Sequence, residues 1–153
     1  MRKRNAERTI SKRRCEVKVL FVDDEVDFLE VMVKRLKKRD LDVTSLSDGN
    51  KVIELIEKNN FDVVVLDVRM PGCKNGIEIL KDIKKCRPLV EVVMLTGHAL
   101  LDVAKEGIEN GAFDYMVKPA DIDELFYILN DAYKKKTIQE SKIKNIEHLL
   151  QNK

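Results

Sequence analysis

The sequence predicts an α/β domain in which helices cover both faces of a parallel sheet. The first observation is alternation: short apolar runs rich in β-branched residues are separated by segments with helical apolar spacing. The second is the run Val63-Val64-Val65-Leu66, whose continuous apolar character is typical of a strand buried on both faces. The third is that this run stops at a carboxylate, Asp67, shortly before the turn residues Pro71-Gly72. We expect right-handed crossovers, so that the carboxyl ends of the strands meet at one edge of the sheet.

Five apolar runs predict the strands, in chain order. The first ends in Asp23-Asp24-Glu25, and the second is short and ends before the turn Ser47-Asp48-Gly49. The third is the Val-rich run. The fourth ends in Thr96-Gly97 and the fifth in Lys118-Pro119. The predicted strands are residues 17–22, 41–46, 62–66, 91–95 and 113–117.

The segments that follow these strands have apolar residues three and four positions apart, which is the spacing of one buried helix face. Asp48 and Asp121 precede two of them and are candidates for capping the first turn. The predicted helices, with their apolar residues, are 26–38 (Leu29, Met32, Leu36), 50–59 (Val52, Ile53, Ile56), 76–86 (Ile77, Leu80, Ile83), 100–109 (Leu101, Ala104, Ile108) and one from about Asp121 (Leu125, Ile128, Leu129, Ala132).

Length and composition are those of a soluble globular domain. The 153 residues are enough to bury a core, and 37% are charged while 44% are hydrophobic. No apolar run approaches the roughly 18 residues of a membrane span, and no signal-peptide core follows the N-terminus. The three cysteines include no Cys-x-x-Cys pair, so we expect neither a disulfide framework nor a zinc site. A reducing cytoplasm is the expected compartment.

Charge divides the chain into three regions. Residues 1–15 hold seven Lys or Arg against one Glu, and residues 134–153 hold six Lys against two Glu, so the part between them is acidic. We expect a basic, disordered arm over 1–15, a domain over 16–134 and a helical tail over 135–153. Contact of the arm with nucleic acid is an alternative, but no aromatic residue is interleaved with its basic residues, and we expect no nucleic-acid partner.

Four of the predicted strands end in a polar group suited to chemistry. These groups are Asp23-Asp24, Asp67, Thr96 and Lys118, and a parallel sheet brings all of them to one edge. Three carboxylates at one place repel each other, so they share protons or bind a cation. Oxygen ligands without His or Cys favour Mg²⁺. A Lys ammonium and a Thr hydroxyl beside that cation form a pocket for a phosphoryl group, with Asp67 as candidate nucleophile.

Four stretches carry a resemblance to a known family. They are Val-Asp-Asp-Glu at 22–25, Leu-Asp-Val-Arg-Met-Pro-Gly at 66–72, Leu-Thr-Gly-His at 95–98 and Gly-Ala-Phe-Asp-Tyr-Met-Val-Lys-Pro at 111–119. Together they resemble the receiver domain of response regulators in bacterial two-component signal transduction systems, over about residues 17–133. The resemblance implies a flavodoxin-like (βα)5 doubly wound parallel sheet of strand order 2-1-3-4-5, followed here by a C-terminal helical extension.

The resemblance also implies a role for each residue of the site. Asp67 is the implied phosphoacceptor, phosphorylated by a sensor histidine kinase in a Mg²⁺-dependent reaction. Asp24 and Asp67 are the implied direct metal ligands, together with the backbone carbonyl of Arg69, while Asp23 acts mostly through metal-bound water. Lys118 is implied to pair with one oxygen of the phosphoryl group.

Further implied roles concern signalling and the lifetime of the phosphate. The Thr96 hydroxyl bonds another phosphoryl oxygen, and Tyr115 moves inward when Thr96 is drawn to the phosphate, which reshapes the face made by the fourth helix, fifth strand and fifth helix. Arg69 and His98 flank the phosphoryl group at positions that vary within the family, so they are candidates for setting its lifetime. The loop at 73–75 has one residue more than is usual in the family.

The end of the chain has a spacing of its own. From Leu125 to Leu150, positions in steps of four and three follow the heptad spacing of a coiled coil, with polar interruptions at Lys136 and Gln139. Pairing with a second copy of the chain, as a homodimer, and local packing of a helical tail both stay open. In either case we expect contact with protein at Ile143, Ile146 and Leu150.

The leading hypothesis is a phosphoacceptor signalling domain and not an enzyme, since it promotes only its own phosphorylation and dephosphorylation. About 20 residues follow the receiver, so we expect output through an unknown downstream protein and no membrane partner. One alternative is a phosphorylation-independent interaction scaffold, against which the retention of all five polar site residues argues. Another is an aspartate-dependent phosphatase, which needs a general acid two positions after the nucleophile, where this chain has Arg69.

Overall fold

A computed structural model of the protein describes residues 16–70, 72, 75–97 and 101–152. These residues contain a five-stranded parallel sheet in the order β2-β1-β3-β4-β5. The strands are β1 Lys18–Val22, β2 Asp42–Leu46, β3 Val63–Asp67, β4 Glu91–Thr96 and β5 Asp114–Val117. The predicted doubly wound parallel sheet and its strand order are confirmed.

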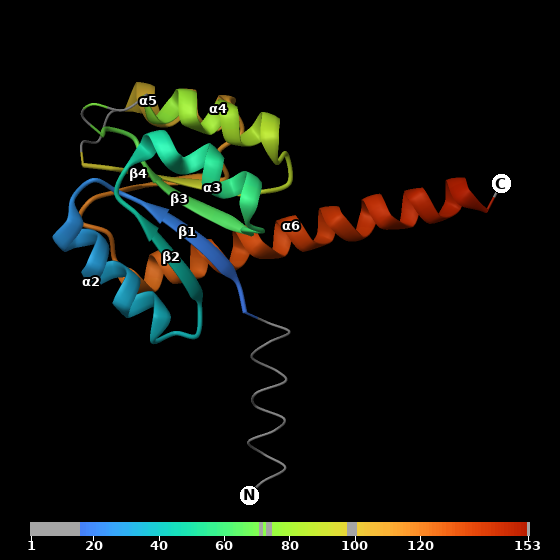
Figure 1. The fold of residues 1–153 in the computed structure, drawn as a ribbon, viewed down its shortest axis with the longest axis horizontal. Helices are drawn as coiled ribbons and strands as arrows, with labels where there is room; N and C mark the ends of the chain where they lie inside the picture. The colour runs from blue at the N-terminus through green and yellow to red at the C-terminus, as the bar shows by residue number, and fades with distance from the viewer. Residues whose placement is uncertain (1–15, 71, 73–74, 98–100, 153) are drawn as a thin grey trace, which may run out of the picture.

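Helices cover both faces of the sheet. Figure 1 shows α2 and α6 on one face, and α3, α4 and α5 on the other. The helical segments are α2 Val26–Lys37, the short 3-10 turn η1 Gly49–Lys51 that leads into α3 Val52–Lys58, α4 Gly76–Cys86, α5 Leu101–Glu109 and α6 Ile122–Gln151.

The central strand β3 serves both cores. Val63 and Val65 pack in the cluster beneath α2 and α6, whereas Val64 and Leu66 pack in the cluster beneath α3 and α4. Every residue of β3 is buried, which is why its sequence lacks the alternation of a half-exposed strand. Burial on both faces holds the carboxyl end of β3, and therefore Asp67, in a fixed position.

Most predicted boundaries agree with the structure to within one or two residues. The predicted helix over 50–59 instead starts as a 3-10 turn, where the Asp48 side chain accepts the backbone N–H of Asn50 at 3.0 Å. In α5, Leu101 and Ile108 were expected on the apolar face but are 74% and 44% exposed. The buried residues of this helix are Ala104 and Gly107.

The reason for the altered face of α5 is its close approach to the sheet. A Cβ atom built on Gly107 would lie 2.5 Å from Sδ of Met94. A helix that packs this closely presents its smallest residues to the strand, so the larger aliphatic side chains on either side are turned outward.

The last helix, α6, is capped as predicted and is unusually long. The Asp121 carboxylate accepts the backbone N–H groups of Asp123 and Glu124 at 2.8 and 3.1 Å. The helix spans 30 residues and buries Leu125, Leu129 and Ala132 against the sheet. Figure 1 shows its C-terminal half projecting beyond the domain. Across the described residues, no helix combines the length and apolar character needed to cross a membrane.

Candidate functional site

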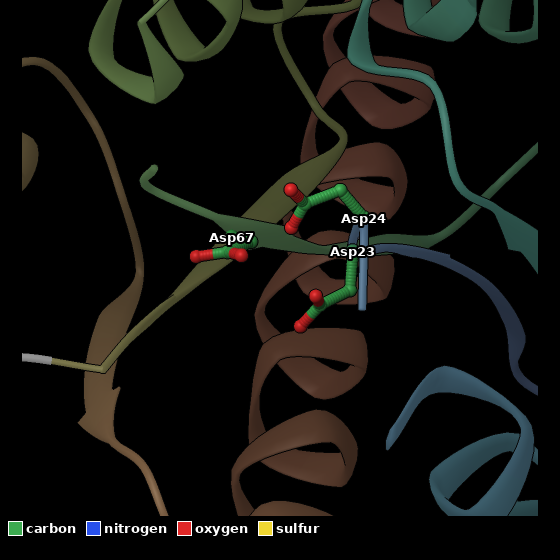
Figure 2. A group of neighbouring side chains, drawn as sticks. All are labelled: Asp23, Asp24 and Asp67. Atoms are coloured by element: carbon green, nitrogen blue, oxygen red, sulfur yellow. The ribbon is translucent and has the colours of Figure 1, made fainter. Parts of the chain in front are cut away.

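Three aspartates meet at the carboxyl edge of the sheet. Asp23 and Asp24 follow β1, and Asp67 is the last residue of β3 (Figure 2). Each of the three offers a carboxylate oxygen, and these oxygens lie within 4.8 Å of one another. Asp23 is fully buried, Asp67 is 4% exposed and Asp24 is half-buried. The expectation that the strand ends bring these acids together is confirmed by this geometry.

Backbone hydrogen bonds that continue the ladders past the strands hold these residues in place. The N–H of Asp23 donates to the carbonyl of Leu46 at 3.1 Å, which extends the pairing of β1 with β2. On the other side of the site, the N–H of Lys118 donates to the carbonyl of Thr96 at 2.7 Å. The functional side chains therefore project from backbone that is still part of the sheet.

Lys118 turns its ammonium into the acidic cluster. Its Nζ lies 2.8 Å from Oδ2 of Asp23 and 3.5 Å from Oδ2 of Asp67. It also lies 4.6 Å from the centre of the Phe28 ring and 3.5 Å from the Glu25 carboxylate. One cation thus faces several acids, so the site keeps a surplus of negative charge.

The protonation of the site follows from burial and from this surplus. Burial, and after it the charge of the Asp23 carboxylate, raise the pKa of Asp67 to about 6 against the opposing effects of Lys118 and of the Arg69 N–H. Burial alone would lower the pKa of Lys118, but the hydrogen bond to Asp23 and the charge of Asp67 outweigh it and raise that pKa. Lys118 is therefore a permanent cation at neutral pH.

The remaining expected residues lie around this centre. Thr96 is the buried last residue of β4, one position beyond Leu95, which is the register partner of Asp67. Arg69 is exposed, and its backbone N–H donates to Oδ1 of Asp67 at 3.2 Å. Tyr115 on β5 is 38% exposed, so its ring lies at the surface in this structure. His98 lies outside the described residues, as do Cys73 and Lys74 of the lengthened loop.

The end of that loop is held tightly against the site. Gly76, the first residue of α4, donates its N–H to the carbonyl of Val68 at 3.0 Å. A Cβ atom at Gly76 would lie only 2.7 Å from Cα of Val68, so the absence of a side chain permits this approach. The Asn75 side chain caps α4 by accepting the N–H of Ile77 at 3.0 Å.

Sequence reasoning missed two residues that contact Lys118. The sequence places Glu25 in an acidic motif and Phe28 in a predicted helix, but it does not predict that either contacts Lys118. The signal for Glu25 was its place directly after the two aspartates. Phe28 had no local signal, because its contact with Lys118 depends on how α2 packs against the sheet.

The comparison with family models is decisive. Residues 19–130 match the model described as response regulator receiver domain. The chain belongs to the response regulator receiver family. This confirms the resemblance drawn from the four sequence motifs, and with it the assignment to two-component signalling.

The chain matches much longer curated proteins over only part of their length. It is 37% identical over 111 residues to the DNA-binding transcriptional regulator NtrC of Klebsiella pneumoniae, covering 72% of this chain and 24% of that protein. It is 32% identical over 128 residues to the transcriptional regulatory protein ZraR of Klebsiella oxytoca, covering 84% of this chain and 29% of that protein. The chain thus spans about a quarter of the length of these relatives.

Solved structures agree on the fold. A response regulator receiver domain protein from Clostridium thermocellum is 33% identical, with a TM-score of 0.76, and the match covers 80% of this chain and 98% of that one. The receiver domain of Francisella response regulator 1452 is also 33% identical, with a TM-score of 0.72 over 78% of this chain and 98% of that one. The receiver fold is therefore shared over nearly the full length of both domains.

Proposed function

We propose that this receiver accepts a phosphoryl group on Asp67 from a histidine kinase and passes the signal on through a changed protein-binding face. The observation that carries the proposal is the cluster of Asp23, Asp24 and Asp67, whose oxygens lie within 4.8 Å of one another, with the Lys118 ammonium 3.5 Å from Asp67. The family match supports signalling as the role. We place the protein in the cytoplasm, where the kinase domain would reach it.

We propose Mg²⁺ as the cofactor. The donors are all carboxylate oxygens, which suits a hard cation, and their charge exceeds that of the single Lys118. Oδ2 of Asp23 is buried and lies 2.8 Å from the Lys118 ammonium. Asp24, Asp67 and the carbonyl of Arg69 would hold the ion directly and Asp23 through water. When bound, the ion supplies positive charge that stabilises the oxygens of the transferring group.

The residues of the chain then divide the transfer among them. A carboxylate oxygen of Asp67 attacks the phosphorus of the kinase phosphohistidine, a P–O bond forms, the P–N bond breaks, and the released imidazole takes up a proton. Lys118 stands where its ammonium can pair with an oxygen of the new acyl phosphate, and the Thr96 hydroxyl bonds another. Arg69 and His98 are proposed to control how water reaches the acyl phosphate, and therefore its lifetime.

The signal is proposed to leave through the face formed by α5, β5 and the start of α6. This face already exposes apolar side chains in the present structure: Leu101, Ile108, Tyr115 and Val117. Movement of Thr96 towards the phosphoryl group would open space for the Tyr115 ring to turn inward, which would change the apolar outline of this face. The downstream partner is proposed to be a protein that reads this outline.

The test is phosphorylation by a small donor. The full chain is incubated with acetyl phosphate and Mg²⁺, and its intact mass is measured over time. We expect the mass of one phosphoryl group to be added, and the addition to vanish in Asp67→Asn and on chelation of the metal. The matched control is Asp42→Asn, which changes an exposed carboxylate at the opposite edge of the sheet and should leave the reaction intact.

Other outcomes would assign a different function. If the chain rapidly hydrolyses phosphoesters and retains no phosphoryl group, it is a phosphatase. If no variant and no donor, including a phosphorylated histidine kinase domain, gives a phosphorylated product, the chain is a phosphorylation-independent scaffold. Labelling that persists in Asp67→Asn would place the acceptor on another residue.

A further inference from the structure

A groove runs along the free edge of the sheet. β5 is the last strand in the order, so one of its edges has no partner strand. The groove has a volume of about 460 Å³ and lies between β5 and the start of α6. Acidic and apolar side chains line it together, among them Asp114, Tyr115, Val117, Pro119 and Glu124. An open strand edge beside a groove can receive a segment of another protein.

The apolar part of the groove is exposed. Tyr115 and Val117 lie two positions apart on β5, so their side chains are on the same side of the strand, and they are 38% and 37% exposed. On α6, Tyr127 is 67% exposed and lies about one turn beyond Glu124. Aromatic and branched aliphatic side chains that gather at the surface are typical of a protein-binding surface.

The charge around this groove is strongly negative. The segment that forms α5, β5 and the start of α6, residues 101–124, holds seven Asp or Glu against two Lys. One of the two, Lys118, places its ammonium in the aspartate cluster, 2.8 Å from Asp23. No Lys or Arg is among the described residues that line the groove. The resulting negative potential favours a cationic partner.

Two of the acids at the groove stand out from their neighbours. Asp121 accepts two N–H groups as the cap of α6, and Asp123 pairs with Arg39. The Glu124 carboxylate, in contrast, is exposed and forms no ion pair with any residue that the structure describes. The Asp114 carboxylate is held at the strand edge, because its Oδ1 accepts the N–H of the next residue at 2.8 Å. Negative charge is thus fixed on both the strand side and the helix side of the groove.

We propose that the groove between β5 and α6 binds a basic segment of the downstream protein, with an aliphatic side chain between Lys or Arg residues. The aliphatic side chain would pack against Tyr115 and Val117, and the flanking cations would pair with Asp114 and Glu124. This assignment rests on the proposed function, which uses the same face for output. A second copy of this chain is disfavoured here, because it would bring the same acids face to face, and an anionic lipid or nucleic acid would be repelled for the same reason.

The test measures how a synthetic peptide of alternating Lys and Leu binds to the full, unphosphorylated chain, by fluorescence anisotropy at low ionic strength. We expect saturable binding, whereas the same peptide with Glu in place of Lys should not bind. The double variant Asp114→Asn, Glu124→Gln should bind the Lys-Leu peptide about tenfold more weakly, because it removes both charges at nearly unchanged size. The amide that replaces the Asp114 carboxylate can still accept the backbone N–H, so the strand edge keeps its geometry.

The matched control is the double variant Asp42→Asn, Glu30→Gln. It makes the same two chemical changes at exposed acids on β2 and α2, away from the groove, and should leave the affinity within about twofold. Val117→Thr tests the apolar contact and should weaken binding by about two- to threefold, since a hydroxyl replaces a methyl group. Backbone amide signals that shift on peptide addition should lie in β5 and the start of α6.

The proposal and the proposed function fail by different readouts. Equal loss of affinity in the groove variant and in the control variant would show only a general attraction to an acidic domain and would overturn the proposal. Equal binding of the Lys-Leu and Glu-Leu peptides would overturn it as well. Failure of the proposed function would instead appear in the intact mass, as the absence of a phosphoryl group on Asp67 with either result for the peptide.

Discussion

Both edges of the sheet carry buried acids, but they balance charge differently. At the amino edge, the Glu91 carboxylate is 3% exposed and lies 3.9 Å from the Lys84 ammonium and 3.4 Å from the Lys135 ammonium. Asp62, at the same edge, lies 2.9 Å from the Lys136 ammonium. Glu91 and Asp62 thus each have at least one cation of their own.

At the carboxyl edge, Asp23 and Asp67 share the Lys118 ammonium, and Asp24 adds a third carboxylate to the same cluster. The closest pair there joins Asp23 to Lys118 at 2.8 Å, and Asp67 receives the same ammonium only at 3.5 Å. The comparison teaches how to separate structural acids from functional ones in this fold. Acids that have lysines of their own attach α4 and α6 to the sheet, whereas a buried surplus of acid prepares a place for a cation and a phosphoryl group.

The largest effect is expected from exchanging one lysine at each edge. Lys118→Ala removes the cation that faces Asp67, so phosphorylation by acetyl phosphate should slow by about 100-fold. Lys136→Ala removes a lysine that holds α6 to Asp62, so it should lower stability but leave the phosphorylation rate within about twofold. Intact-mass time courses at saturating Mg²⁺ measure both rates. Equal rates in the two variants would remove the distinction between the edges.

The next largest effect is on the free energy of unfolding. Neutralising an acid should raise it at the carboxyl edge of the sheet and lower it at the amino edge. With metal chelated at pH 8, Asp67→Asn should stabilise the protein by about 1–3 kcal/mol. The reason is that the neutral amide removes one buried negative charge from a cluster in which the carboxylates outnumber Lys118. Glu91→Gln should destabilise it by about 1–3 kcal/mol, because it leaves Lys84 and Lys135 facing a neutral group. Urea unfolding of both variants measures the two changes. A destabilised Asp67→Asn variant would show that Lys118 already neutralises the site.

The stability of the metal-free protein should depend on pH because of the Asp67 carboxylate. The pKa of Asp67 rises from 3.8 to about 6 on folding, so the folded protein holds this proton more tightly than the unfolded chain does. The stability from this residue is fully present below pH 3.8 and is lost as the pH rises through about 6. Unfolding free energies of the wild type and Asp67→Asn should therefore diverge between these pH values, and parallel curves would contradict the assignment.

A smaller effect is expected from adding the cation. Mg²⁺ at ten times its dissociation constant should stabilise the folded protein by about 1.4 kcal/mol. The gain should be strongly reduced in Asp24→Asn, which removes a proposed ligand, and retained in Glu91→Gln, whose acid lies at the other edge. Thermal unfolding with and without Mg²⁺ measures it. A gain that survives in Asp24→Asn would place the ion elsewhere.

Much of the fold could be predicted because its elements have strong local patterns. The helix predicted near 76–86 has the bounds of α4, since its apolar residues repeat along one face. The face of α5 was wrong at Leu101 and Ile108, because the close contact of Gly107 with Met94 decides which side chains turn outward. That contact involves a different strand and has no signature in the helix itself.

Much of the site was also predictable, because a parallel sheet converts positions at strand ends into neighbours in space. Asp23, Asp24, Asp67 and Lys118 were expected together, and they lie together. Glu25 and Phe28 were not expected beside Lys118, since their contacts depend on where α2 begins and how it packs.

The sequence by itself determined the apolar periodicities of the helices, the polar residues at the strand ends and the heptad spacing along the last helix, because each depends on residues close together in the chain. Only the tertiary structure decided which charges are balanced and which apolar residues stay exposed. Lys136 and Asp62 are 74 residues apart yet form an ion pair, and Ile143 continues a buried stripe yet lies in solvent. Charge balance and burial depend on distances in space, and those distances exist only once the sheet and α6 have come together.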